Sequence, residues 1–218
     1  MKIYLATASF DDARWAAGCG LLDGLLVAPS MVESSASTAA RAVELSRLFA
    51  IPVILSLATR DASLLYSEGK EVARECDDVV VDFPLGADTI EELHRATVDG
   101  VSVAASMVFT SAQALLAAKA GAAAVLVHIP VLEAQGQTAA AALGEMRRIF
   151  DIHRMECEIV AVTPSSAGEV SVCAAAGADA VVLQPSVLRD LLLHPLADRT
   201  LDALLAATSS GYHRARFR

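Results

Sequence analysis

Short runs of β-branched and apolar residues recur along the whole chain, separated by longer segments rich in alanine and leucine. Eight runs stand out: Lys2–Ala6, Asp23–Ala28, Pro52–Ser56, Asp78–Phe83, Val101–Ser106, Ala124–His128, Glu158–Thr163 and Ala180–Leu183. Runs of this length predict strands, and the intervening segments have helical length. Strands that alternate with helices pair in parallel through right-handed crossovers. The pattern therefore predicts eight successive βα units.

Start and stop signals repeat at the same places in these units. Capping boxes are expected at Asp88 with Glu91, at Thr110 with Gln113, and at Ser166 with Glu169. Glycine stands just before the next strand at Gly100, Gly121 and Gly177, where a helix commonly ends in a left-handed residue. With no linker or low-complexity tract between units, we expect one compact domain over residues 1–218, an α/β (β/α)8 TIM barrel.

Composition agrees with this expectation and excludes several functions. Hydrophobic residues make up 55% of the 218 positions but aromatic residues only 5%, which suits small-residue helices packed on a buried parallel sheet. The formal charge of −9 repels phosphate backbones and anionic lipids, so neither a nucleic acid nor a membrane is an expected partner. The basic tail His213–Arg218 is best interpreted as a solvated terminus.

The cysteines indicate a reducing environment. Cys19, Cys76, Cys157 and Cys173 lie far apart, without the spacing of a zinc site or a redox motif. We expect them to be buried, reduced thiols, and we expect no metal and no cofactor. The first residues lack the long apolar core of a signal peptide. Together these features predict a cytoplasmic protein.

In a barrel of this kind the chemistry lies where the strands end, because the βα loops converge there. The polar residues that this rule selects are Asp82, Ser106, His128, Thr163, Gln184 and, beside Leu55, Ser56. Ala6 and Ala28 are the corresponding residues of the first two strands.

Several stretches resemble a known family. They are residues 3–8, 22–30, 108–122 (with Ser-Ala-Gln-Ala-Leu-Leu-Ala-Ala-Lys-Ala-Gly-Ala), 133–136 and 193–198. By these motifs the sequence resembles the transaldolase family, in its short branch that includes the fructose-6-phosphate aldolases. The resemblance implies a TIM barrel and carbon–carbon bond chemistry on sugar-derived compounds.

The same resemblance shows what this chain lacks. Relatives form a Schiff base on a strand-4 lysine, and that position is Asp82 here. The strand-1 aspartate, the strand-2 asparagine and the strand-3 glutamine or glutamate correspond to Ala6, Ala28 and Leu55, and the two arginines that hold a substrate phosphate fall at Val131 and near Gly168. Ser106, Thr163 and His128 stand at family positions that remain polar. The only lysines, Lys2, Lys70 and Lys119, are not expected at the barrel mouth.

Two hypotheses follow. In the first, the protein is an enzyme that acts on a small carbonyl or sugar-derived compound without a Schiff base. Asp82 and His128 then exchange protons, and Ser106, Thr163, Ser56 and Gln184 bind the substrate. In the second, the barrel is catalytically inactive and serves as a metabolite-binding or scaffold protein.

The resemblance also implies a homo-oligomer, a pentamer or decamer, in which the C-terminal helix and tail from about residue 197 pack on a neighbouring subunit. Leu201, Leu204 and Leu205 have the spacing of one apolar helix face.

Overall fold

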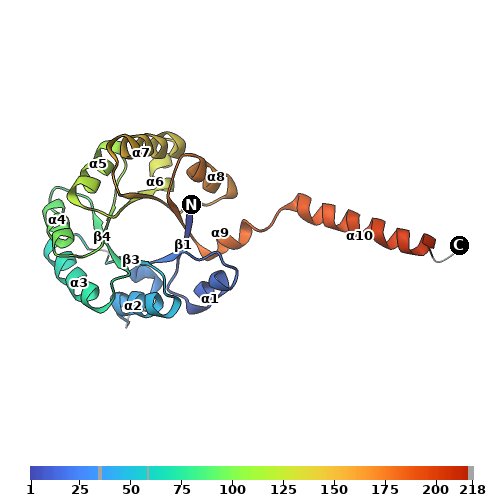
Figure 1. Ribbon diagram of the computed structural model, residues 1–218, viewed down its shortest axis with the longest axis horizontal. Helices are drawn as coiled ribbons and strands as arrows, with labels where there is room; N and C mark the ends of the chain where they lie inside the picture. Colours follow the sequence, from blue (N-terminus) through green and yellow to red (C-terminus); the bar gives the residue numbers. More distant parts are fainter. Residues whose placement is uncertain (34–35, 58, 216–218) are drawn as a thin grey trace. The chain divides into compact units, whose positions relative to one another are not determined.

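A computed structural model describes residues 1–33, 36–57 and 59–215, with side chains described as far as residue 207. Eight parallel strands form a closed barrel in the order β1-β2-β3-β4-β5-β6-β7-β8 (Figure 1). The strands are β1 (Lys2–Ala6), β2 (Gly24–Val27), β3 (Val53–Ser56), β4 (Val79–Pro84), β5 (Val103–Ser106), β6 (Ala124–His128), β7 (Glu158–Val162) and β8 (Ala180–Leu183). The predicted fold class is therefore confirmed.

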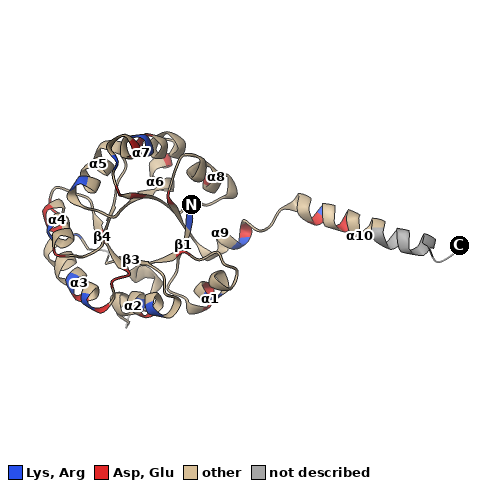
Figure 2. Cartoon of the chain, in the orientation of Figure 1, with Lys and Arg blue, Asp and Glu red and all other residues tan. Residues whose placement is uncertain are grey.

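Helices surround this barrel (Figure 1). They are α1 (Phe10–Gly18), the short 3-10 helix η1 (Pro29–Met31), α2 (Thr38–Phe49), α3 (Ala62–Glu75), α4 (Ile90–Val98), α5 (Ser111–Ala120), α6 (Ile129–Ala134), α7 (Ala139–His153) and α8 (Ala167–Ala175). Lysine, arginine, aspartate and glutamate lie largely along the outer helices (Figure 2). Most charged side chains thus lie outside the barrel, with Asp82 as a buried exception.

The chain divides into two units, Met1–Pro185 and Ser186–Arg218. The second unit contains most of α9 (Pro185–Asp190) and all of α10 (Pro195–Ala215). The side chains of the basic tail from His213 lie outside the described residues, so its expected solvation remains a prediction. Within the described residues, no helix is long and apolar enough to cross a bilayer.

Local sequence signals explain most helix boundaries. The capping box of α5 is present, with Thr110 accepting from the Gln113 N–H while the Gln113 side chain accepts from the Thr110 N–H. Gly100, Gly121 and Gly177 all have positive φ, as expected from their positions. The predicted box at Asp88 is wrong, because α4 begins after Thr89 and that residue makes no side-chain cap. The Thr89 hydroxyl instead donates to the Pro84 carbonyl oxygen at 2.5 Å.

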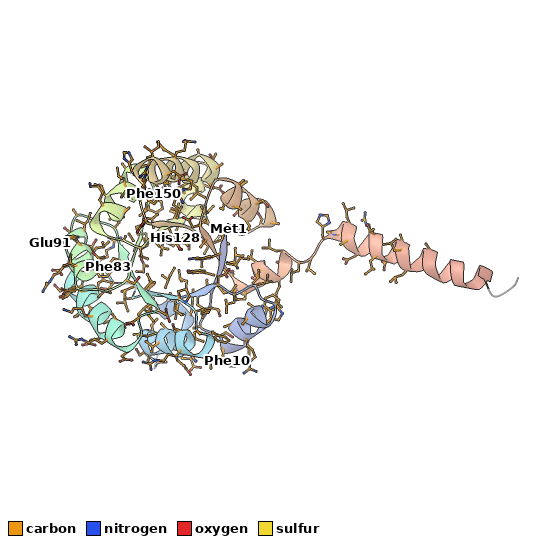
Figure 3. The ribbon with its side chains drawn as sticks, viewed as in Figure 1. Met1, Phe10, Phe83, Glu91, His128 and Phe150 are labelled. Atoms are coloured by element: carbon orange, nitrogen blue, oxygen red, sulfur yellow. The ribbon has the colours of Figure 1, made fainter. Side chains whose placement is uncertain are left out.

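Alternation along each strand fills the barrel. One inner cluster contains Tyr4, Leu26, Ile54, Ala104, Ala124, Leu126, Val160, Val162, Ala180 and Val182, and Ala6, Ala28 and Val80 pack against it. Side chains occupy the ring that the strands outline (Figure 3). Ala6 and Ala28 are therefore small inner residues, as expected. Leu55 is not an inner residue, because its neighbour Ile54 points inward and successive strand residues face opposite sides.

Candidate functional site

Asp82 lies on the inner face of β4, near the carboxyl end of the barrel. Val80, two residues earlier, packs against the inner cluster, so alternation places Asp82 on the same face. The register pairs Asp82 with Ser56 of β3, and it pairs Pro84 with Ser106 of β5. Asp82 itself lies opposite Ala104 of β5, and the Ser56 and Ser106 side chains both lie close enough to the carboxyl group to act on its pKa.

Burial controls the chemistry of this carboxyl group. Asp82 is 8% exposed and Ser106 is 2% exposed. Burial raises the pKa of Asp82 to about 6, although the nearby Ser106 and Ser56 side chains act in the opposite direction. Among the described residues, neither Asp82 Oδ1 nor Ser106 Oγ has a hydrogen-bond partner of good geometry. Two buried polar atoms beside each other therefore have bonding capacity for a ligand or water.

His128 ends β6 and directly precedes α6. It is half-buried, and burial lowers its pKa, which favours the neutral imidazole. Among the described residues, no ion pair or hydrogen bond joins His128 to Asp82. The structure places both residues at the same end of the barrel without pairing them directly.

The other expected binding residues also lie at strand ends. Thr163 follows β7, Gln184 follows β8, and Ser56 is the last residue of β3. Thr163 is half-buried and Gln184 is exposed. Thr163 has φ of 57°, and Met107, directly after β5, has φ of 58°. Left-handed non-glycine residues are strained, and here two of them shape the barrel mouth. The sequence does not single out Met107, because only its backbone angle distinguishes it.

The lysines lie elsewhere and are poorly suited to Schiff-base formation. Lys2, at the opposite end of β1, has its Nζ 2.5 Å from Glu158 Oε1, and this hydrogen bond raises its pKa. The Nζ atom of Lys70 on α3 lies 2.9 Å from Asp99 Oδ2, and this hydrogen bond raises the pKa of Lys70. Lys119 is an exposed residue near the end of α5. A Schiff-base lysine needs a lowered pKa, so the raised values of Lys2 and Lys70 argue against that role.

The two positions at which we expect a substrate phosphate carry no arginine. Val131 is an exposed apolar residue of α6. Near Gly168, the first turn of α8 contains Glu169, whose Oε2 accepts from the Ser165 N–H at 2.8 Å. That hydrogen bond is the main cause of the lowered pKa of Glu169. A carboxylate of the chain itself therefore occupies the start of this helix, a common phosphate position in such barrels.

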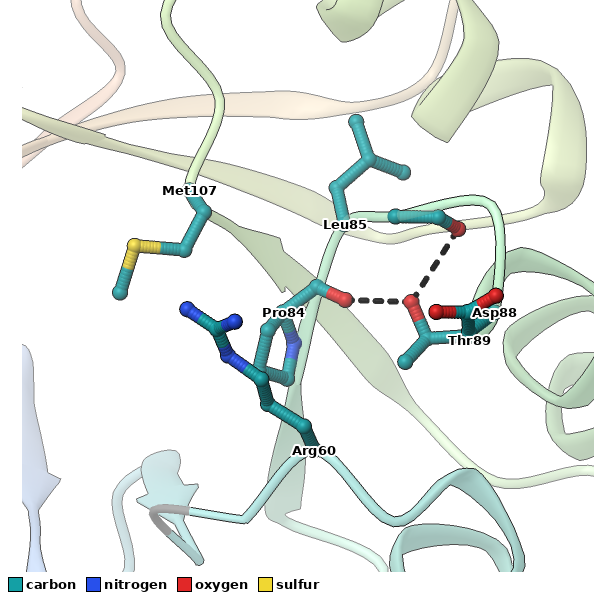
Figure 4. A pocket seen from close by; sticks show the side chains of 7 residues that line it. Arg60, Pro84, Leu85, Asp88, Thr89 and Met107 are labelled. Carbon is teal, nitrogen blue, oxygen red and sulfur yellow. Dashed lines mark hydrogen bonds between the residues drawn. The ribbon is translucent and has the colours of Figure 1, made fainter.

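A pocket of about 230 Å³ opens beside the ends of β4 and β5 (Figure 4). It is lined by Arg60, Pro84, Leu85, Gly86, Asp88, Thr89 and Met107. Asp82 is not among the lining residues, although Pro84 follows it by two positions on the same strand. Arg60, which precedes the α3 N-cap residue Asp61, lies in a loop beyond the end of β3 and was therefore not among the predicted site residues.

The described residues contain other reactive groups, which lie apart from one another. Within the described part of the chain, no group of three or more His, Cys, Asp or Glu residues is placed to hold a metal ion. All four cysteines are free thiols. Cys157 and Cys173 are buried and their pKa values are raised, to about 12 and about 11, by burial. The expectation of burial is wrong for Cys19, which is exposed at the end of α1, and for Cys76, which is only half-buried.

Comparison with known proteins agrees with the barrel geometry. The profile of the family described as Transaldolase/Fructose-6-phosphate aldolase matches residues 36–216. A "Probable transaldolase" of Hyphomonas neptunium is 34% identical over 207 residues, covering 94% of this chain and 96% of the relative. Proteins with the same description from Parvibaculum lavamentivorans and Maricaulis maris are 33% and 32% identical, each covering 94% of this chain and 95% of the relative. The family match over residues 36–216 and the relatives at 32–34% identity show that this chain, a closed eight-stranded barrel, belongs to the transaldolase and fructose-6-phosphate aldolase family.

Proposed function

We propose that this barrel acts on a small carbonyl or sugar-derived compound by acid–base chemistry, with Asp82 in the place of the family's Schiff-base lysine. The observation that carries the proposal is the Asp82 carboxyl group, which is buried at a strand end with Oδ1 unpartnered and with its pKa raised to about 6. A carboxyl group with a pKa near the working pH can both accept and release a proton.

In this proposal Asp82 removes a proton from the carbon next to the substrate carbonyl. The Ser106 hydroxyl donates a hydrogen bond to the oxygen on which negative charge develops, using an atom that has no partner among the described residues. His128, neutral because burial lowers its pKa, accepts the proton of the hydroxyl group on the neighbouring carbon and passes it to the carbonyl oxygen. Protonated Asp82 then returns a proton to carbon, which restores both side chains. Ser56, Thr163 and Gln184 hold hydroxyl groups of the substrate.

The test is proton exchange at carbon. The protein is incubated with dihydroxyacetone in D2O, and proton NMR follows deuterium incorporation next to the carbonyl. We expect exchange above the buffer rate, and we expect Asp82→Asn to lower it by at least about 100-fold, since a positioned acid–base group contributes that much or more. Asp77→Asn, an exposed acid that precedes β4, is the matched control and should exchange at the native rate. Exchange that persists in Asp82→Asn would refute the role of this residue.

A second experiment addresses the missing Schiff base. Borohydride added with dihydroxyacetone or fructose 6-phosphate should leave the protein mass unchanged, because none of the three lysines lies at the carboxyl end of a barrel strand. A stoichiometric adduct on Lys2, Lys70 or Lys119 would contradict this expectation.

The rival proposal is a catalytically inactive homologue that binds a metabolite or acts as a scaffold. The concerted replacement of polar residues by Ala6 and Ala28 favours it, since these small residues pack against the apolar inner cluster. Saturable binding of dihydroxyacetone without deuterium exchange would support this alternative. For either function we propose a cytoplasmic location, on the evidence of the four free thiols.

A further inference from the structure

We infer that Arg60 and the pocket beside it form an oxyanion subsite, which binds a phosphate or carboxylate group next to the barrel centre. The inference concerns binding alone and does not depend on Asp82 acting as an acid or base. Positive charge is scarce at the barrel mouth. Of all the loops that lead from a strand to the next helix, only the one after β3 contains a lysine or arginine in the sequence, and that residue is Arg60.

The guanidinium group is available for a ligand. Among the described residues, Arg60 makes neither an ion pair nor a side-chain hydrogen bond. The adjacent acid, Asp61, is used as the N-cap of α3, where Oδ1 accepts from the N–H groups of Ser63 and Leu64 at 3.0 and 3.1 Å. An unpaired guanidinium beside a pocket has a planar set of donors that matches carboxylate and phosphate oxygens.

The pocket has a suitable position and lining. Figure 4 shows the guanidinium between Pro84 and Met107, with Asp88 on the other side of Thr89. Pro84 lies two residues beyond Asp82 and Met107 one residue beyond Ser106, so the pocket is about 7 Å along the strand direction from the buried carboxyl group. A compact ligand can therefore place its oxyanion at Arg60 while its other end approaches the barrel centre.

The alternative oxyanion position at the same end of the barrel is filled. The start of α8 holds Glu169, whose carboxylate accepts from the Ser165 N–H at 2.8 Å and from the Ser165 hydroxyl at 3.0 Å. An incoming anion there would have to displace this internal carboxylate. Asp88, which lines the Arg60 pocket, opposes anion binding by its charge, and its removal should therefore strengthen binding.

The experiment is equilibrium dialysis of the full-length protein with radiolabelled inorganic phosphate. Unlabelled glycolate is added as a competitor to test whether the same site binds a carboxylate. We expect one saturable site per chain. Arg60→Gln should weaken phosphate binding at least tenfold. Arg60→Lys should weaken it less, because the positive charge remains although the planar guanidinium donors are lost. Asp88→Asn should strengthen phosphate binding severalfold. Arg74→Gln, on the exposed face of α3, is the matched control and should bind as the native protein does. Thermal melting verifies that each variant is folded.

The two ligand sources give different results. Phosphate binding without competition by glycolate would identify a phosphate ester as the ligand class, and displacement of phosphate by glycolate would show that the subsite accepts carboxylates. If labelled phosphate shows no saturable binding to the native protein, the inference is overturned. Equal affinity of Arg60→Gln and the native protein would also overturn it.

Discussion

At the scale of single residues, Asp82 is a group whose charge costs stability. The usual aspartate pKa is 3.8, and burial raises that of Asp82 to about 6. Between these values the folded protein holds a proton that the unfolded chain has lost. The stabilising contribution of Asp82 protonation is therefore complete below about pH 4 and is lost as the pH rises through about 6. The difference between these two pKa values corresponds to about 3 kcal/mol of stability.

We therefore predict that Asp82→Asn raises the free energy of unfolding relative to the native protein at about pH 7, by up to about 3 kcal/mol, and has little effect at about pH 4. Urea unfolding of both proteins at the two pH values measures the difference. Comparison with the variant is needed because Asp99 and Glu169 have lowered pKa values and contribute with the opposite sign. Asp77→Asn should follow the native pH profile. A native protein more stable than Asp82→Asn at about pH 7 would show that the carboxylate is structural.

At the scale of secondary-structure elements, the packing around β2 leaves no room for a side chain at Gly24. A Cβ atom on Gly24 would lie 2.8 Å from the Tyr4 ring and 2.9 Å from the Pro52 carbonyl oxygen. Tyr4 is buried in the barrel, and the Pro52 oxygen accepts the Leu25 N–H at 3.0 Å. Neither neighbour can move freely. We predict that Gly24→Ala costs about 1–3 kcal/mol of stability by overpacking, measured by urea unfolding. Gly18→Ala, with no heavy atom within 4 Å, should change stability by less than about 0.5 kcal/mol.

Some elements of this barrel could be predicted from the sequence and others could not. The β1, β6 and β8 bounds were predictable because each strand is a short apolar run that ends at a polar residue or directly before one. The Thr110 box was predictable because it uses only local contacts. The predicted capping box at Asp88 was wrong because the Thr89 hydroxyl donates to the Pro84 carbonyl oxygen and α4 begins only at Ile90. Asp82 was found because strand ends converge in a barrel, whereas the Met107 backbone and the Arg60 pocket depend on three loops meeting in space.

At the scale of the whole molecule, α10 presents the remaining structural problem. Within the C-terminal unit, Leu201, Leu204 and Leu205 recur at the spacing of one helix face. A single helix cannot bury such a face against itself, so the face must pack on its own barrel or on another subunit. We propose the second arrangement, in which a heterologous contact repeats until it closes into a ring, a pentamer or decamer.

The expected result is a homo-oligomer in light scattering at micromolar concentration, with a mass several times the 22.7 kDa of one chain. The double variant Leu201→Glu, Leu205→Glu should dissociate it, because two charges would enter the contact between subunits. Leu48→Glu changes a leucine of similar exposure on α2 and should leave the assembly intact, which separates an effect of the α10 face from a general effect of charge. If the native protein scatters as a single chain, α10 must cover its own barrel, and any ligand site must be complete within one subunit.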